Sequence, residues 1–128
     1  MLGWFEKRRT ASIFMLMLIA IEIFYFSSLS SSGGAGGNIW IPRIYHFAVF
    51  FLFAFFLFAV IKKDKKIKAK YIVIVVIISI VYAVLDEFHQ TFVPGRDASI
   101  RDILTDTLGI FLLIAIYSYS IKKAGKTK

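Results

Sequence analysis

The chain contains no cysteine and few acidic residues. Its 128 residues include Cys 0 and Asp+Glu 8 against Lys+Arg 16, which gives a formal net charge of +8. Without cysteine, the chain can form neither a disulfide scaffold nor a cysteine-ligated metal site. It also has no internal repeat, no nucleophile in a recognisable catalytic setting and no recognised metal-binding spacing. The informative features are therefore the apolar composition and the positions of the few charges.

Apolar residues dominate the composition. Hydrophobic residues make up 59% of the chain and the mean hydropathy is +0.75, compared with about 45–50% apolar residues in soluble domains. The lysines occur in short clusters between hydrophobic runs, which suits a membrane surface. They form no stripe interleaved with aromatic residues, so nucleic-acid binding is not expected. The composition predicts one all-α integral membrane domain, residues 1–128.

Four apolar runs predict a bundle of four transmembrane helices. A helix needs about 20 mostly apolar residues to cross a bilayer, and the runs have about this length. The first run, which follows a basic start, also resembles a signal peptide. It is longer than the usual apolar core of about 7–15 residues and contains Glu22, so a retained helix is expected. The expected spans are 11–29, 44–61, 71–90 and 100–121.

The basic residues predict the orientation of these helices. Thirteen of the 16 Lys and Arg lie in the N-terminal tail, the 62–70 loop and the C-terminal tail. The other two loops contain only Arg43, Arg96 and Arg101. Short loops rich in Lys and Arg stay on the cytoplasmic side. Both termini are therefore expected in the cytoplasm, and the other two loops on the outer side.

This orientation brings polar side chains of all four helices to the outer leaflet. Six of the chain's eight acids belong to this layer, Asp97 among them. Charged groups between apolar segments are costly, which favours a functional role. All three Lys or Arg residues of the layer are arginine, which binds carboxylate or phosphate through paired hydrogen bonds. The expected ligand-binding residues are Glu22, Arg43, His46, Asp86, Glu87, Gln90, Arg96, Ser99, Arg101, Asp102 and Asp106.

Helical spacing groups these residues further. Asp86, His89 and Gln90 share one helix face, and Asp102, Asp106 and Gly109 share another, because residues three or four apart are neighbours on a helix. Gly109 admits the close approach of a second helix. Ser99 and Asp102 form a helix-start signature, in which hydroxyl and carboxylate satisfy free amides. Facing carboxylates repel one another, so Arg96, Arg101, a bound cation or protonation must compensate.

Two groups of these residues resemble the signature of the VanZ-like family of small bacterial membrane proteins. The first is Asp86-Glu87-x-x-Gln90 with Val93-Pro94-Gly95-Arg96, Ser99, Asp102, Asp106 and Gly109; the second is Arg43-x-x-His46 followed by Phe50. Arg43 stands where the family has Lys, and Phe50 stands where Tyr is common, so a hydroxyl is absent there. The resemblance covers nearly the whole chain. It implies a bacterial plasma-membrane location and a link to low-level teicoplanin resistance, without supplying a reaction.

Several functions fit these observations. The first is binding or processing of an anionic lipid or lipid-linked cell-wall intermediate, with arginines on phosphate and Asp86, Glu87 and His46 as candidate acid–base groups. The second is a structural or partner-binding protein in which the polar cluster is an ion-pair network. The third is a divalent-metal-dependent membrane hydrolase or transferase, with Asp86, Glu87, Asp102 and His46 as candidate ligands. A transporter or proton relay is disfavoured because the polar layer does not continue inward. Enzymatic activity, cofactor content and oligomeric state stay open.

Overall fold

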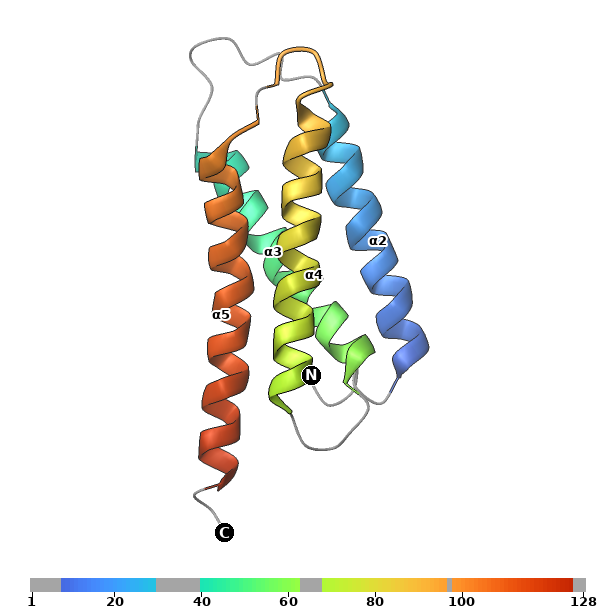
Figure 1. Ribbon diagram of the computed structural model, residues 1–128. Coiled ribbons are helices and arrows are strands. Elements are labelled where there is room, and N and C mark those ends of the chain that lie inside the picture. Colours follow the sequence, from blue (N-terminus) through green and yellow to red (C-terminus); the bar gives the residue numbers. More distant parts are fainter. Residues whose placement is uncertain (1–7, 30–39, 63–67, 97, 126–128) are drawn as a thin grey trace.

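The computed structural model describes residues 8–29, 40–62, 68–96 and 98–125, and of residues 120–125 the backbone alone. Within these ranges the chain is helical and contains no strand (Figure 1). Each helix end lies within four residues of its predicted position. The predicted connection over 30–38, most of the 62–70 loop and Asp97 lie outside the described residues. The helices are α2 (Arg9–Ser28), α3 (Trp40–Ile61), α4 (Ala69–Gln90) and α5 (Ile100–Gly125).

The helices run antiparallel to their neighbours along the chain, and α3 has the central place. It packs against α2, α4 and α5, whereas α2 and α5 make no direct contact among the described residues. The ends of α2 and α4 lie together with the starts of α3 and α5 (Figure 1). We call this end of the bundle the polar end. It is defined by Ser27, His46, Asp86, Glu87, Gln90, Arg96, Asp102 and Asp106.

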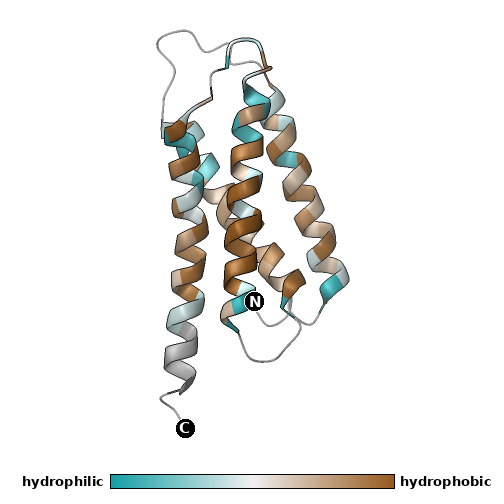
Figure 2. Ribbon diagram, in the orientation of Figure 1, coloured by the Kyte–Doolittle hydropathy of each residue, from teal (hydrophilic) through white to brown (hydrophobic). Residues whose placement is uncertain are grey.

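The outer faces of the helices are apolar. In the described part of the chain, α2, α3 and α4 are each long and apolar enough to cross a membrane. Figure 2 shows hydrophobic residues along the middle of the helices and hydrophilic residues near their ends. A soluble monomer rarely exposes large contiguous apolar patches, so these faces fit contact with lipid. Exposed apolar side chains include Phe14, Met17, Ile21 and Phe24 of α2, Ile77, Val81, Val84 and Leu85 of α4, and Leu104, Leu108 and Phe111 of α5.

Aromatic rings fill much of the space between the helices. Phe50 and Phe58 of α3 are fully buried. The Phe58 ring lies 4.1 Å from that of Tyr117, and Phe53 stacks on Tyr82 with the ring centroids 4.7 Å apart. Such pairs contribute about 0.5–1.5 kcal/mol beyond the burial of their area. The phenylalanines of α3 therefore form much of the core of the bundle.

The closest approach between helices is at Gly109, where α5 lies against the backbone of α3. A Cβ atom at Gly109 would overlap the carbonyl oxygen of Phe47 and lie 3.2 Å from the amide nitrogen of Phe51. Only a residue without a side chain fits at this distance, which confirms the expectation that Gly109 admits a second helix. Phe47 follows His46 directly, and Gly109 lies one turn after Asp106. The contact therefore brings these two polar side chains to the same level.

We expect Gly109→Ala to lower the thermal stability of the protein in detergent. The methyl group would push α3 and α5 apart, at a cost on the order of 1–3 kcal/mol for overpacking, which exceeds the gain of about 1 kcal/mol in helix propensity. The measurement is the midpoint of thermal unfolding, followed by circular dichroism. Leu108→Ala is the control, because Leu108 is 62% exposed. Equal midpoints for the two variants would contradict the role given to the α3–α5 contact.

Candidate functional site

The polar end is built around a buried contact between α3 and α5. The Nδ1 atom of His46 lies 3.0 Å from Oδ1 of Asp106, and both side chains are buried. When Asp106 is ionised, its carboxylate only accepts hydrogen bonds, and the ring hydrogen then lies on Nδ1. The Nε2 atom of His46 is then the ring nitrogen that can accept a proton or bind a metal.

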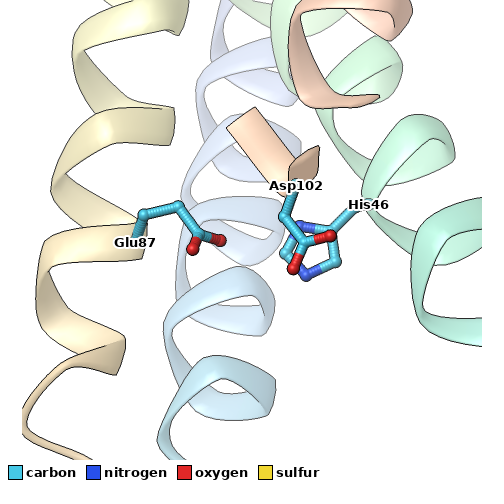
Figure 3. A group of neighbouring side chains, drawn as sticks. All are labelled: His46, Glu87 and Asp102. Atoms are coloured by element: carbon cyan, nitrogen blue, oxygen red, sulfur yellow. The ribbon is translucent and has the colours of Figure 1, made fainter. Parts of the chain in front are cut away.

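The carboxylates of Glu87 and Asp102 lie close to His46. One ring nitrogen of His46 and one oxygen each from Glu87 and Asp102 lie within 4.8 Å of one another. The three side chains come from α3, α4 and α5, and Figure 3 shows the carboxylate of Glu87 pointing toward the other two. Glu87 is 2% exposed and Asp102 is partly buried. We call His46, Glu87 and Asp102 the carboxylate–histidine cluster.

The start of α5 helps to hold Glu87 in this cluster. The carbonyl oxygen of Ser99 accepts the amides of Asp102 and Ile103 at 3.0 and 3.2 Å, so α5 begins where the sequence predicted. In the expected helix-start signature, the carboxylate of Asp102 accepts a hydrogen bond from the backbone amide of Ser99. Here the Ser99 amide donates instead to Oε2 of Glu87 in α4, at 2.7 Å. A neighbouring helix thus supplies the capping carboxylate, and the Asp102 carboxylate lies in the cluster.

Gln90 connects the acids to the loop that follows α4. Its Nε2 atom donates to Oδ2 of Asp86 at 3.0 Å and to Oε1 of Glu87 at 3.3 Å. The same atom lies 3.4 Å from Oγ of Ser27 in α2. The side-chain oxygen of Gln90 accepts a hydrogen bond from Nη1 of Arg96 at 3.1 Å. A neutral amide therefore stands between the arginine and the nearest carboxylates.

A tight turn positions Arg96. The Arg96 amide donates to the carbonyl oxygen of Val93 at 3.1 Å, and Gly95 has φ 77. A positive φ at the third residue, with Pro94 at the second, is the signature of a type II turn, which favours glycine. The turn reverses the chain after α4, so that the side chain of Arg96 lies over the end of α2.

The guanidinium of Arg96 binds backbone carbonyl groups at the end of α2, one of which, that of Phe26, also accepts the Leu29 amide. Its Nε atom donates to the oxygen of Leu29 at 3.2 Å, and Nη2 donates to the oxygen of Phe26 at 3.3 Å. The last carbonyl groups of a helix lack partners inside the helix, and a positive charge there is favourable. None of the three acceptors of Arg96 is a carboxylate.

The charges of the polar end are consequently not matched by arginine. Within the described ranges, the one contact between a basic and an acidic side chain at ion-pair distance is His46 with Asp106, and it is an ion pair only when the imidazole is protonated. Arg101 is exposed, and the guanidinium carbon of Arg43 lies 5.7 Å from the centre of the Trp40 ring. The ion-network alternative requires arginine–carboxylate pairs, and the described part of the chain contains none. Arginine pairing, one of the expected means of compensation, is therefore not observed among these residues.

A pocket opens between the end of α2 and the start of α3. Its volume is about 320 Å³, and its wall is mostly apolar. The hydroxyl group of Tyr45 in this wall is buried and has no hydrogen-bond partner. His46 belongs both to the pocket and to the carboxylate–histidine cluster. The pocket is lined by Phe26, Ser27, Leu29, Ile41, Pro42, Tyr45, His46 and Arg96.

The remaining expected residues lie around this centre. Asp86 is buried but lies outside the carboxylate–histidine cluster. Glu22 is exposed on α2. His89, expected on one face with Asp86 and Gln90, lies against α2, where its Nε2 is 3.0 Å from Oγ of Ser28 and its ring stacks on Phe24.

Two residues of the site were not expected from the sequence. Ser27 is buried beside Gln90, and Tyr45 lines the pocket next to His46. Their positions carried a weak signal, because each is a polar residue at the polar end of an apolar helix. Nothing in the sequence showed that the two helix ends enclose a pocket.

A comparison with protein-family models places the chain. The model described as VanZ/LLP1 matches residues 5–122. The chain belongs to the VanZ/LLP1 family. This confirms the resemblance inferred from the sequence, and the match includes every residue of the polar end. Comparisons with curated proteins and with solved structures gave no match.

Phe50, the position where the resemblance led us to expect tyrosine, is part of the core. Phe50 is fully buried, with its ring 6.2 Å from that of Phe53 and 6.3 Å from that of Tyr82. An apolar ring needs no hydrogen-bond partner there. Phe50 therefore packs in the core of this VanZ/LLP1 protein.

We expect Gln90→Leu to destabilise the protein by roughly 2–3 kcal/mol. Leucine has a similar size but removes the hydrogen bonds of the Gln90 amide to Asp86 Oδ2, Glu87 Oε1 and Arg96 Nη1, and leaving a buried polar atom without its partner costs about 1–3 kcal/mol. The measurement is unfolding in detergent with increasing temperature or denaturant. Thr91→Val is the control, because Thr91 is exposed and its hydroxyl bonds only to the nearby carbonyl oxygen of Phe88. If Gln90→Leu and Thr91→Val have the same unfolding midpoint, Gln90 does not hold the polar end together.

Proposed function

We propose that this VanZ/LLP1 protein binds the phosphate-bearing headgroup of an anionic lipid or lipid-linked cell-wall intermediate in the pocket at the polar end. The observation that carries the proposal is the set of hydrogen-bond partners of Arg96. This side chain lines the pocket and has only neutral hydrogen-bond acceptors among the described residues. A guanidinium has five N–H donors, and three are used in these bonds. An arginine with free donors and no carboxylate partner suits a phosphate.

The rest of the pocket fits an amphiphile. Phe26, Leu29 and Ile41 give the wall an apolar surface, and the hydroxyl of Tyr45 lies buried in this wall without a hydrogen-bond partner. Small-molecule sites usually have about 300–1,000 Å³, so a volume of about 320 Å³ suits a headgroup rather than a whole lipid. The hydrocarbon chains would then lie along the exposed apolar faces of the bundle.

The proposal includes a topology with four spans. We place α5 in the membrane as the fourth span because its 26 residues extend over about 39 Å at 1.5 Å per residue. It packs along α3 and α4 and exposes apolar residues such as Leu108 and Phe111. The end of α3 and the start of α4, which flank the 62–70 loop, lie opposite the polar end. Because short loops rich in lysine and arginine stay inside, the proposed topology has both termini in the cytoplasm and the polar end on the outer side of the plasma membrane.

This location suits a role in the cell envelope. Cell-wall precursors are exposed at the outer leaflet, and glycopeptide antibiotics such as teicoplanin target them. Binding and sequestering a lipid-linked intermediate there would change its access to the antibiotic. This connects the proposed site with the teicoplanin resistance that the family name implies. Bond cleavage is not required.

The topology is tested with single cysteines introduced into the cysteine-free chain. In intact cells, a membrane-impermeant maleimide is expected to label Ala98→Cys, at the polar end. Lys68→Cys, before α4, should be labelled only after the cells are permeabilised. Both residues are exposed in the structure. The reverse pattern of labelling would contradict the proposed orientation.

The binding site is tested with Arg96→Gln in purified protein. We expect the affinity for phosphatidic acid and for a polyprenyl phosphate to fall roughly tenfold or more, because a hydrogen bond to a charged group contributes about 1.5–3 kcal/mol. Native mass spectrometry from detergent gives the bound fraction, with phosphatidylcholine as the reference lipid. Arg101→Gln removes the same charge from an exposed position at the same end and should retain binding. Equal binding by both variants across these lipids would refute the proposal.

A further inference from the structure

We propose that His46, Glu87 and Asp102 bind a divalent metal ion of the Mn²⁺ or Zn²⁺ class. The three ligand atoms lie within 4.8 Å of one another and come from three different helices (Figure 3). Ligand atoms about 2.0–2.2 Å from one ion are at most about 4.4 Å apart. Small rotations of the side chains therefore bring all three atoms onto one ion.

The charge of the polar end favours a cation at this position. Asp86, Glu87 and Asp106 are 6%, 2% and 0% exposed, and Asp102 lies beside them. Among the described residues no lysine or arginine pairs with any of these carboxylates. A buried charge without a partner is strongly unfavourable. A divalent ion between the carboxylates would offset their repulsion and the cost of their burial.

The histidine is held as metal ligands usually are. A metal-binding histidine commonly donates its other ring N–H to a carboxylate, which fixes the orientation of the ring and makes the free nitrogen a better ligand. Asp106 has this relation to Nδ1 of His46, at 3.0 Å. Asp106 is fully buried and its Oδ2 atom has no hydrogen-bond partner. A role in orienting the His46 ring explains why the Asp106 carboxylate is buried here.

Glu87 is held in a similar way. Oε2 accepts the amide of Ser99, and Oε1 accepts the side chain of Gln90. Each carboxylate oxygen has a second lone pair for a metal. Because two neighbours fix this carboxylate, binding an ion would require little ordering of the side chain.

The ligand set selects the class of metal. One imidazole nitrogen and two carboxylates, without cysteine, suit Mn²⁺ or Zn²⁺, whereas Ca²⁺ usually takes six to eight oxygen ligands. Three protein ligands leave coordination positions open. His46 also lines the pocket, so a phosphate oxygen bound there would have access to the ion. This last link rests on the proposed headgroup binding, whereas metal binding itself does not.

The test is a titration of the purified full-length protein with Mn²⁺ after removal of metals by a chelator, without added lipid. Electron paramagnetic resonance measures free Mn²⁺, and we expect one bound ion per chain. Electron spin-echo modulation of the bound ion should show one imidazole nitrogen. Zn²⁺ is expected to displace the Mn²⁺.

Variants assign the bound ion to the cluster. Glu87→Gln, Asp102→Asn and His46→Gln should each weaken Mn²⁺ binding at least roughly tenfold, and Glu87→Gln keeps an acceptor for the Ser99 amide. Asp106→Asn should weaken it about 10–100-fold, the range for residues that orient a ligand. Glu22→Gln removes an exposed carboxylate from α2 and should bind Mn²⁺ like the unchanged protein.

Several outcomes would overturn the metal site. They are no stoichiometric binding, affinity unchanged by the three ligand substitutions (an adventitious ion only), and no imidazole nitrogen around the ion. The nitrogen signal of the unchanged protein decides the question even where a variant does not fold. Arg96→Gln should retain Mn²⁺ binding. Loss of lipid binding with Mn²⁺ binding intact in that variant separates the metal site from the headgroup site.

Discussion

The arrangement of the polar end depends on the close approach of α5 to α3 at Gly109. Because Gly109 has no side chain, the backbones of the two helices meet beside Phe47. Asp106 lies one turn before Gly109 in α5, and His46 directly precedes Phe47 in α3. The contact therefore brings Oδ1 of Asp106 to 3.0 Å from Nδ1 of His46. The orientation of the imidazole ring, and with it the direction of its free nitrogen, follows from this contact.

Neutral groups separate the opposite charges in the polar end. Gln90 lies between Arg96 and the carboxylates of Asp86 and Glu87, and the backbone carbonyl groups of α2 occupy the other donors of Arg96. If the arginine bound the acids directly, both charges would be neutralised. Instead a cationic group faces the pocket, and a group of carboxylates lies beside it. Such an arrangement suits a phosphate at the first and a metal ion at the second.

The position of these groups between helices with apolar outer faces suits an amphiphilic ligand. The pocket lies between two helices whose outer faces are apolar, and its wall is mostly apolar as well. A lipid that diffuses in the bilayer can present its headgroup to such a pocket while its chains stay in contact with the helices. The core below the site is packed with aromatic rings of α3, which supports the polar end without extending it inward.

The sequence by itself determined the four helices, a glycine in α5 that admits a second helix, the family and the gathering of polar residues at one end. These features depend on the length of apolar runs and on spacing along one helix, which are local properties. Only the tertiary structure decided that Glu87 and Asp102, and not Asp86, share a cluster with His46. It also decided that Arg96 bonds to neutral groups and that Glu87 caps α5. These choices depend on how each helix is rotated about its axis and on the side-chain rotamers that packing allows, and neither is encoded in the spacing of residues along the chain.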